Sequence, residues 1–138
     1  MDPNSIDIAV VGAHLSGFPL NKDLTSRGAI LLQTTSTSAS YRLFVLSNSF
    51  PRKPGLCRAL NHEDSGAIEV EIWRLPKSEV GSFIETVPSP LGIGTIELKD
   101  GTWVKGFICE PYAMQGATEI TESGGWRAYT DSLDTPTI

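Results

Sequence analysis

The chain has 138 residues, a length typical of one domain, which buries roughly two-thirds of its unfolded surface and needs no disulfide or metal to hold a core. Its net charge is −5, and its 11 lysines and arginines are scattered, with Arg52 and Lys53 the one adjacent pair, which argues against nucleic-acid binding. Its apolar runs are too short for a membrane span and no signal sequence begins it, so we expect a soluble cytoplasmic protein without a membrane partner.

The first expected element is a buried strand at residues 6–11, a run rich in β-branched side chains. A loop of small residues follows at 12–17 and contains a single histidine, His14. Pro19 is expected to open a two-turn helix that ends at Gly28, where helices often place a left-handed glycine. The loop around His14 is the strongest functional candidate in the sequence.

Two further strands are expected at residues 29–34 and 41–46, which are apolar and β-prone and are separated by a Ser/Thr-rich connector. Residues 50–56 contain two prolines and Gly55. Proline removes a backbone donor, so we expect an ordered loop without regular structure there.

The clearest alternation of the chain lies in the next strand, where Ile68, Val70 and Ile72 point to one face and Glu69 and Glu71 to the other. A solvated outer face is the common place for such carboxylates. The alternative is a polar interior, in which they would handle protons or bind a ligand.

An amphipathic helix is expected after Pro76, because Val80, Phe83, Ile84 and Val87 have the spacing of one helix face. The prolines of residues 88–90 end it.

The last expected strands, residues 93–98 and 103–109, flank Lys99-Asp100-Gly101, a typical hairpin turn. Beyond residue 110 the periodicity fades, apart from a possible capped turn at 118–123. We therefore expect one α+β domain over residues 6–130, with mostly antiparallel strands and two or three short helices, and flexible termini at 1–5 and 131–138.

Two cysteines, Cys57 and Cys109, lie far apart and form no Cys-x-x-Cys pattern. Two reduced core thiols are therefore expected, and neither a metal nor a cofactor. A disulfide would imply a secreted context that nothing else in the sequence supports.

Several short segments occur together in a fixed order, and together they resemble the C-terminal domain of allophanate hydrolases over nearly the whole chain. The segments are VGAHLSG (11–17) with PLN (19–21), YRL (41–43), KPGL (53–56), IEVEIW (68–73), PLGIG (90–94), VKGF (104–107) and GGWRAY (124–129).

The resemblance implies a fold similar to γ-glutamylcyclotransferases, a small β-barrel with flanking helices. Residues 11–14 occupy the position at which those enzymes have a Tyr-Gly loop. The acid/base glutamate of a cyclotransferase is expected just after the amphipathic helix, where this chain has Pro88-Ser89-Pro90. This difference argues against glutamyl cyclisation.

The resemblance also implies a role in urea and allophanate catabolism. The amidase signature of allophanate hydrolase is absent from these residues, so the chain alone is not expected to cleave amides. It is expected to decarboxylate N-carboxyurea, a carbamate, after an amidase domain or subunit has released ammonia.

His14 is the expected catalytic residue, protonating the departing nitrogen near neutral pH. The amides of Gly12, Ala13 and Leu15 are expected to bind the carboxylate of a small carbamate.

The remaining expected ligand contacts come from charged and aromatic side chains far apart in the sequence. They are Tyr41, Lys53, Glu71, Lys105 and Arg127. We expect His14 to share a pocket with at least two of Tyr41, Glu71, Lys105 and Arg127. For each charged residue, solvated surface is the alternative, and His62 is expected to be solvated.

Two other functions remain open on the sequence. One is a non-catalytic binding or assembly module for an amidase, which could also form a homodimer. The other is a cyclotransferase-like enzyme acting on another amine.

Overall fold

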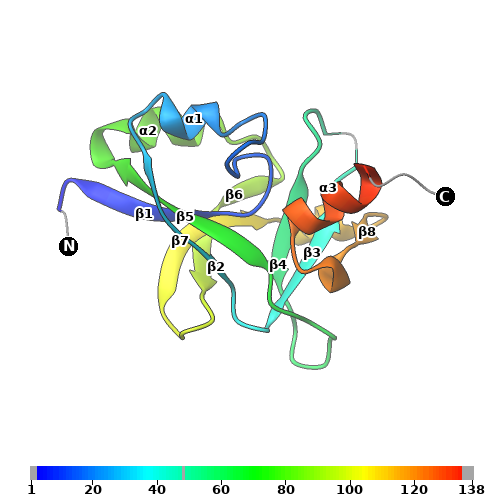
Figure 1. Ribbon diagram of the computed structural model, residues 1–138. Coiled ribbons are helices and arrows are strands. Elements are labelled where there is room, and N and C mark those ends of the chain that lie inside the picture. Colours follow the sequence, from blue (N-terminus) through cyan, green and yellow to red (C-terminus); the bar gives the residue numbers. More distant parts are fainter. Residues whose placement is uncertain (1–2, 48, 135–138) are drawn as a thin grey trace.

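Eight strands form two sheets in residues 3–47 and 49–134, the part of the chain that the computed structural model describes (Figure 1). The strands are β1 (Ser5–Val10), β2 (Ile30–Ser36), β3 (Tyr41–Val45), β4 (Pro54–Arg58), β5 (Glu69–Pro76), β6 (Leu91–Glu97), β7 (Trp103–Cys109) and β8 (Thr118–Glu119). The helices are α1 (Lys22–Thr25), α2 (Val80–Glu85) and α3 (Trp126–Asp134), with short 3-10 turns η1 (Lys77–Glu79), η2 (Pro111–Met114) and η3 (Thr121–Ser123).

The larger sheet has the strand order β2-β5-β1-β7-β6, and the smaller has β4-β3-β8. Neighbouring strands are antiparallel except β1 and β7, which run parallel. The expected hairpin is confirmed: β6 pairs with β7, and Gly101 has the positive φ of 87° that such a turn requires.

The larger sheet curls towards a barrel without closing fully. Just beyond its two outer strands, Thr37 forms a single bridge with Leu98. The Ser38 amide donates to the Glu97 carbonyl at 2.9 Å, and the Lys99 amide to the Ser36 carbonyl at 3.0 Å. The α+β class with short flanking helices is therefore confirmed, whereas the barrel is an open one.

β5 is buried on both faces. Its aliphatic residues face the main core, as predicted, and Glu71 and Trp73 on the other face are only 3% and 5% exposed. The loop after β1 covers this second face, since Ser16 hydrogen-bonds to Glu71. Figure 1 shows α1 and α2 on the same side of β1 and β5 as that loop. Alternation alone could not distinguish a covered face from a solvated one.

Three local predictions need correction. Residues 54–58 form β4 instead of an irregular loop; Pro54 is tolerated because it is the first residue of an edge strand. The helix expected from Pro19 is the single turn α1, preceded by tight turns such as the 3.0 Å hydrogen bond from the Phe18 amide to the Leu15 carbonyl. In α2, Phe83 is fully buried but Ile84 is 46% exposed, so the apolar stripe is narrower than predicted.

The chain ends are ordered further out than expected. The Lys77 amide donates to the Asn4 carbonyl at 2.8 Å, and β1 begins at Ser5. α3 continues to Asp134, so half of the expected flexible end at 131–138 is helical. Residues 1–2 and 135–138 lie outside the described part of the chain.

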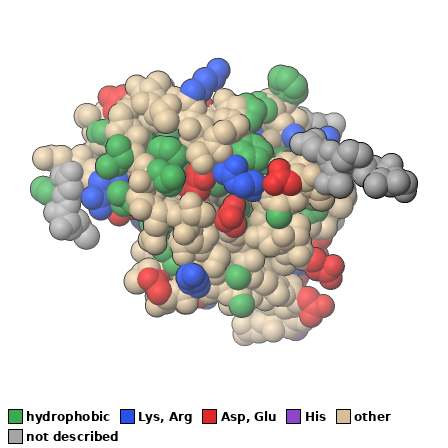
Figure 2. All heavy atoms as spheres, viewed as in Figure 1, with side chains coloured by type: hydrophobic (Ala, Val, Ile, Leu, Met, Phe, Trp, Pro, Cys, Tyr) green, Lys and Arg blue, Asp and Glu red, His purple; other side chains and the backbone are tan. Residues whose placement is uncertain are grey.

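The cysteines, the surface charges and the helix lengths can be compared with the expectations from the sequence. Both cysteines are free thiols, as expected, but only Cys109 is buried; Cys57, on the edge strand β4, is partly exposed and so is not the core thiol that was expected. On the face seen in Figure 2, basic side chains are dispersed among acidic ones and form no continuous basic area. None of the helices in the described residues is long and apolar enough to cross a bilayer.

Candidate functional site

His14 lies in the loop after β1 and is 5% exposed. Its ring stacks on Phe107, with centroids 4.7 Å apart and planes 18° apart, and meets the edge of Phe83 at 5.6 Å. Its Nε2 atom is buried and has no hydrogen-bond partner among the described residues. Such an unpaired buried nitrogen needs an explanation, and a ligand contact is one.

The protonation state of His14 follows from its surroundings. Burial lowers the pKa of His14 from 6.5 to about 4; Asp23 opposes this shift, and the ammonium of Lys53 adds to it. The imidazole is therefore neutral near pH 7 without a ligand. The expected proton donor is absent in this state, which corrects the simplest form of the acid mechanism.

A small cavity of about 10 Å³ adjoins His14, room for roughly one water molecule. Its walls are mainly apolar. The lining residues are Val11, Gly12, Ala13, His14, Lys53, Pro54, Leu56, Leu91 and Phe107. Gly12 permits this close packing, because a Cβ atom at that position would overlap the ring of Pro54.

Lys53 is the charged residue of this cavity. It is 7% exposed, and its Nζ atom lies 3.4 Å from the Pro51 carbonyl oxygen. It forms no ion pair within the described part of the chain. A lysine that is largely buried and has no counter-charge favours an anionic ligand at its ammonium.

The backbone of the loop supplies further donors. The amides of Gly12, Ala13 and His14 donate to no acceptor in residues 3–47 and 49–134. The Leu15 amide donates to the Gly12 carbonyl at 2.9 Å, and the Leu15 side chain is fully buried. Leu15 therefore supports the loop and has no free donor for a ligand.

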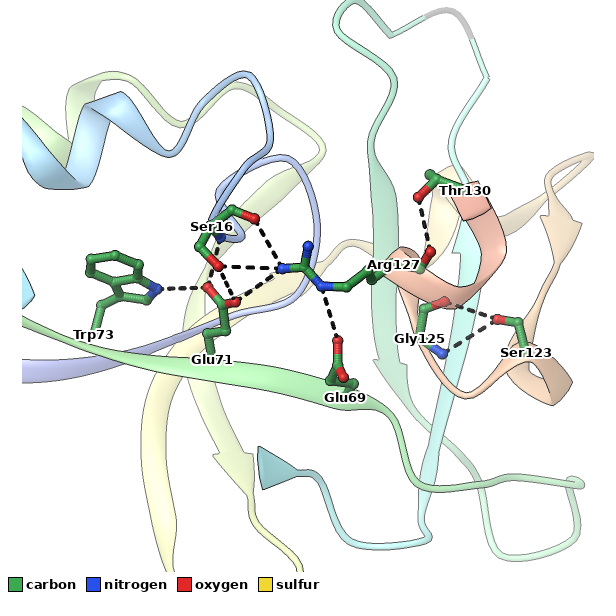
Figure 3. A network of polar contacts seen from close by, with 8 residues as sticks. All are labelled: Ser16, Glu69, Glu71, Trp73, Ser123, Gly125, Arg127 and Thr130. Carbon is green, nitrogen blue, oxygen red and sulfur yellow. Dashed lines mark hydrogen bonds and ion pairs between the residues drawn. The ribbon is translucent and has the colours of Figure 1, made fainter. Parts of the chain in front are cut away.

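Glu71 and Arg127 hold the His14 loop in place from outside the cavity (Figure 3). The Glu71 carboxylate accepts hydrogen bonds from the Ser16 amide at 2.8 Å, the Ser16 hydroxyl at 2.7 Å and the Trp73 indole at 3.0 Å. Arg127, on α3, adds a 3.1 Å ion pair to Glu71 and donates to the Ser16 carbonyl at 3.0 Å. This network joins the loop, β5 and α3.

The expected shared pocket is therefore wrong. Glu71 and Arg127 are engaged with Ser16, and Tyr41 is buried with its hydroxyl oxygen accepting from the Glu97 amide at 2.8 Å. Lys105 is exposed and contacts the Thr95 hydroxyl at 3.2 Å. Of the residues predicted from sequence, His14, Lys53, Gly12 and Ala13 do meet at one cavity. His62 is exposed, as predicted.

An open groove of about 540 Å³ adjoins the cavity, and sequence reasoning missed it. Lys53 lines both spaces, and Pro90 of the groove directly precedes Leu91 of the cavity. The other polar residues of the groove are neutral: Ser47, Ser49, Ser89, Tyr112 and Gln115. These residues come from three separate segments and share no motif, so no signal in the sequence could have grouped them.

The fold belongs to the class of γ-glutamylcyclotransferase-like α+β domains. A solved gamma-glutamyl cyclotransferase superposes with a TM-score of 0.56 over 77% of this chain and 67% of that chain, at 12% identity, which shows the fold alone.

The chain belongs to the allophanate hydrolase C-terminal domain family, whose profile matches residues 6–131. Urea amidolyase of Saccharomyces cerevisiae is 48% identical over 136 residues, which are 96% of this chain and 7% of that protein. Allophanate hydrolase of Kluyveromyces lactis has a TM-score of 0.89 at 42% identity, covering 94% of this chain and 22% of that chain. A uropathogenic Escherichia coli-specific protein has a TM-score of 0.84 at 35% identity, and the match covers 92% of this chain and 96% of that chain. The chain thus spans a small fraction of the curated relatives that it matches.

Proposed function

We propose that this cytoplasmic domain decarboxylates a small carbamate formed by amidase action during urea and allophanate breakdown. The observation that carries the proposal is Lys53, a buried residue whose ammonium has no carboxylate partner among the described residues, beside a neutral histidine and free loop amides. The family relationship supports the pathway, because the relatives are named as urea amidolyases and allophanate hydrolases.

The atom balance of the amidase reaction replaces N-carboxyurea, the substrate expected from the sequence, by a different carbamate. N-carboxyurea is allophanate itself, a carbamate with a terminal amide. When an amidase hydrolyses that amide and releases ammonia, a carboxylate replaces the amide. The product has one NH between two carboxylates and can be named N-carboxycarbamate. The decarboxylation is then N-carboxycarbamate plus one proton giving carbamate and CO₂.

The cavity has room for one oxygen atom of the carboxylate that departs. Its apolar walls at Val11, Leu56 and Phe107 exclude water from a carboxylate, and CO₂ is itself apolar. The free amides of Gly12 and Ala13 can orient this carboxylate through neutral hydrogen bonds. A weak grip is an advantage, because strong binding of the ground state would slow the loss of CO₂.

His14 would supply the proton once the ligand is bound. A dianion close to the imidazole raises its pKa, because an opposite charge favours the protonated form. The imidazolium then gives its proton to the nitrogen as the C–N bond breaks, with the bonding electrons passing to nitrogen. A positioned acid typically accelerates such a step by about 10²–10⁴-fold.

A second candidate function is a non-catalytic module that assembles with an amidase. Three consecutive aliphatic residues of the edge strand β2, Ile30, Leu31 and Leu32, are 57%, 43% and 40% exposed, which would suit a protein partner or a second copy. A cyclotransferase is disfavoured, because neither the cavity nor the groove is lined by a described carboxylate residue.

In the deciding experiment, a separate amidase generates N-carboxycarbamate from allophanate. The release of CO₂ is then followed with and without the chain, at a pH where spontaneous decarboxylation is slow. We expect His14→Gln to lower kcat and Lys53→Met mainly to raise KM, with exposed His62→Gln as the matched control. No acceleration by the wild-type chain, together with a stable complex with the amidase, would eliminate the decarboxylase and support the module.

A further inference from the structure

The small cavity cannot hold the whole substrate. It has room for roughly one water molecule, whereas N-carboxycarbamate has seven non-hydrogen atoms. Most of the substrate must therefore extend beyond the cavity. The adjoining groove, of about 540 Å³, is the space that shares Lys53 with it.

The groove has the donors that a retained carboxylate needs. Lys53 is its one charged lining residue among those described, and its ammonium forms no ion pair with any of them. The Ser89 and Tyr112 side chains approach within 3.1 Å, oxygen to oxygen. One of these hydroxyls donates to the other, so the second proton of the pair is free for a ligand.

The two ends of the substrate would then have different surroundings. The reacting carboxylate lies against apolar walls and His14, and the retained end meets Lys53 and neutral hydroxyls. This division agrees with the chemistry, because the cation binds the end that does not change during the reaction.

We propose that the groove recognises the non-reacting carboxylate of the substrate through Lys53 and the Ser89–Tyr112 hydroxyl pair. The domain thereby selects carbamates with a second carboxylate over those that end in a neutral amide, such as allophanate. This inference rests on the proposed function for the identity of the substrate, but its test does not require turnover.

Malonate and malonamate are suitable stable probes. Replacing the central NH by CH₂ makes malonate the analogue of N-carboxycarbamate and malonamate the analogue of allophanate. Titration calorimetry near pH 7.5 compares the two. A charge-assisted hydrogen bond is roughly twice as strong as a neutral one, so we expect wild-type chain to prefer malonate by about tenfold.

Variants assign the preference to the groove. Lys53→Met should abolish the preference, and Ser89→Ala and Tyr112→Phe should each weaken malonate binding by about two- to tenfold. Both hydroxyl residues are exposed, so these changes should leave folding intact. Ser65→Ala, at an exposed hydroxyl that lines neither space, is the matched control and should bind as wild type.

Equal binding of the two probes, no binding of either, or unchanged malonate binding in both hydroxyl variants would overturn the inference. The outcome is separable from the proposed function. A chain that prefers malonate through these residues but does not accelerate CO₂ release would retain the recognition site without the decarboxylase. A chain that accelerates CO₂ release but treats the probes alike would show the reverse.

Discussion

Replacing His14 by glutamine should reduce the acid sensitivity of the fold. In the unfolded chain a histidine binds a proton near pH 6.5, whereas the folded protein keeps His14 neutral down to about pH 4. The unfolded state therefore binds more protons in this window, and stability falls as the pH falls from 6.5 to 4. Each pKa unit is worth about 1.4 kcal/mol, so His14 alone should cost the wild type about 3 kcal/mol by pH 4. About 2 kcal/mol of this loss should already be present at pH 5.

Urea unfolding of the two proteins at several pH values between 7.5 and 4 measures this effect as the difference in their pH slopes. Glutamine does not titrate, so His14→Gln should lack the His14 contribution even if the lost ring stacking lowers its stability at every pH. Carboxylates titrate in both proteins and cancel in the difference. His62→Gln, at an exposed position, should keep the wild-type slope. If His14→Gln and wild type lose stability in parallel, the argument from burial of a neutral His14 is refuted.

Three further changes test the site. Malonate should bind more tightly as the pH falls from about 8 to about 6.5, where malonate stays a dianion, by at most about tenfold per pH unit, because the anion raises the pKa of His14. Calorimetry in buffers of different ionisation enthalpy should show proton uptake that His14→Gln lacks. Glu71→Ala should destabilise the fold by about 2–4 kcal/mol in urea unfolding, because it leaves the Ser16 amide and the buried Trp73 indole without their acceptor. Glu69→Ala, at the 3.7 Å, half-exposed pair with Arg127, should cost under about 1 kcal/mol. A Glu71 variant as stable as the Glu69 variant would contradict the role given to the network. Gly12→Ala should lower the free energy of unfolding by about 1–3 kcal/mol and abolish malonate binding, because the added Cβ overlaps the ring of Pro54. Gly92→Ala is the control and should keep wild-type stability and malonate binding, because a Cβ there meets nothing within 4 Å.

Much of the strand pattern was predictable because it depends on local chemistry. The run at residues 6–11, the alternation in β5 and the turn at Lys99-Asp100-Gly101 each report a preference that neighbouring residues share. β4 was missed because Pro54 and Gly55 are poor strand residues by themselves. They are accommodated because Pro54 begins an edge strand and because Gly55 packs against Cys109, whose Sγ would lie 2.8 Å from an added Cβ.

The sequence predicted which loop carries the candidate site, but not which residues from other segments line it. His14, Gly12 and Ala13 are neighbours in sequence, so their common location follows from the loop itself. Glu71 and Arg127 have the same charges that a ligand site needs, but the fold directs them to Ser16. Charge and spacing could not reveal which partner each side chain would find.

By itself, the sequence determined the family, the α+β class and the position of the histidine loop, because these depend on residue order and on short-range preferences. Tertiary structure alone decided which face of β5 is covered, that Lys53 is buried without a counter-charge, and that Ser89 and Tyr112 line the same groove as Lys53. These features depend on contacts between segments that are far apart in the chain. Burial is a property of the assembled fold, and burial gives His14 and Lys53 their distinctive chemistry.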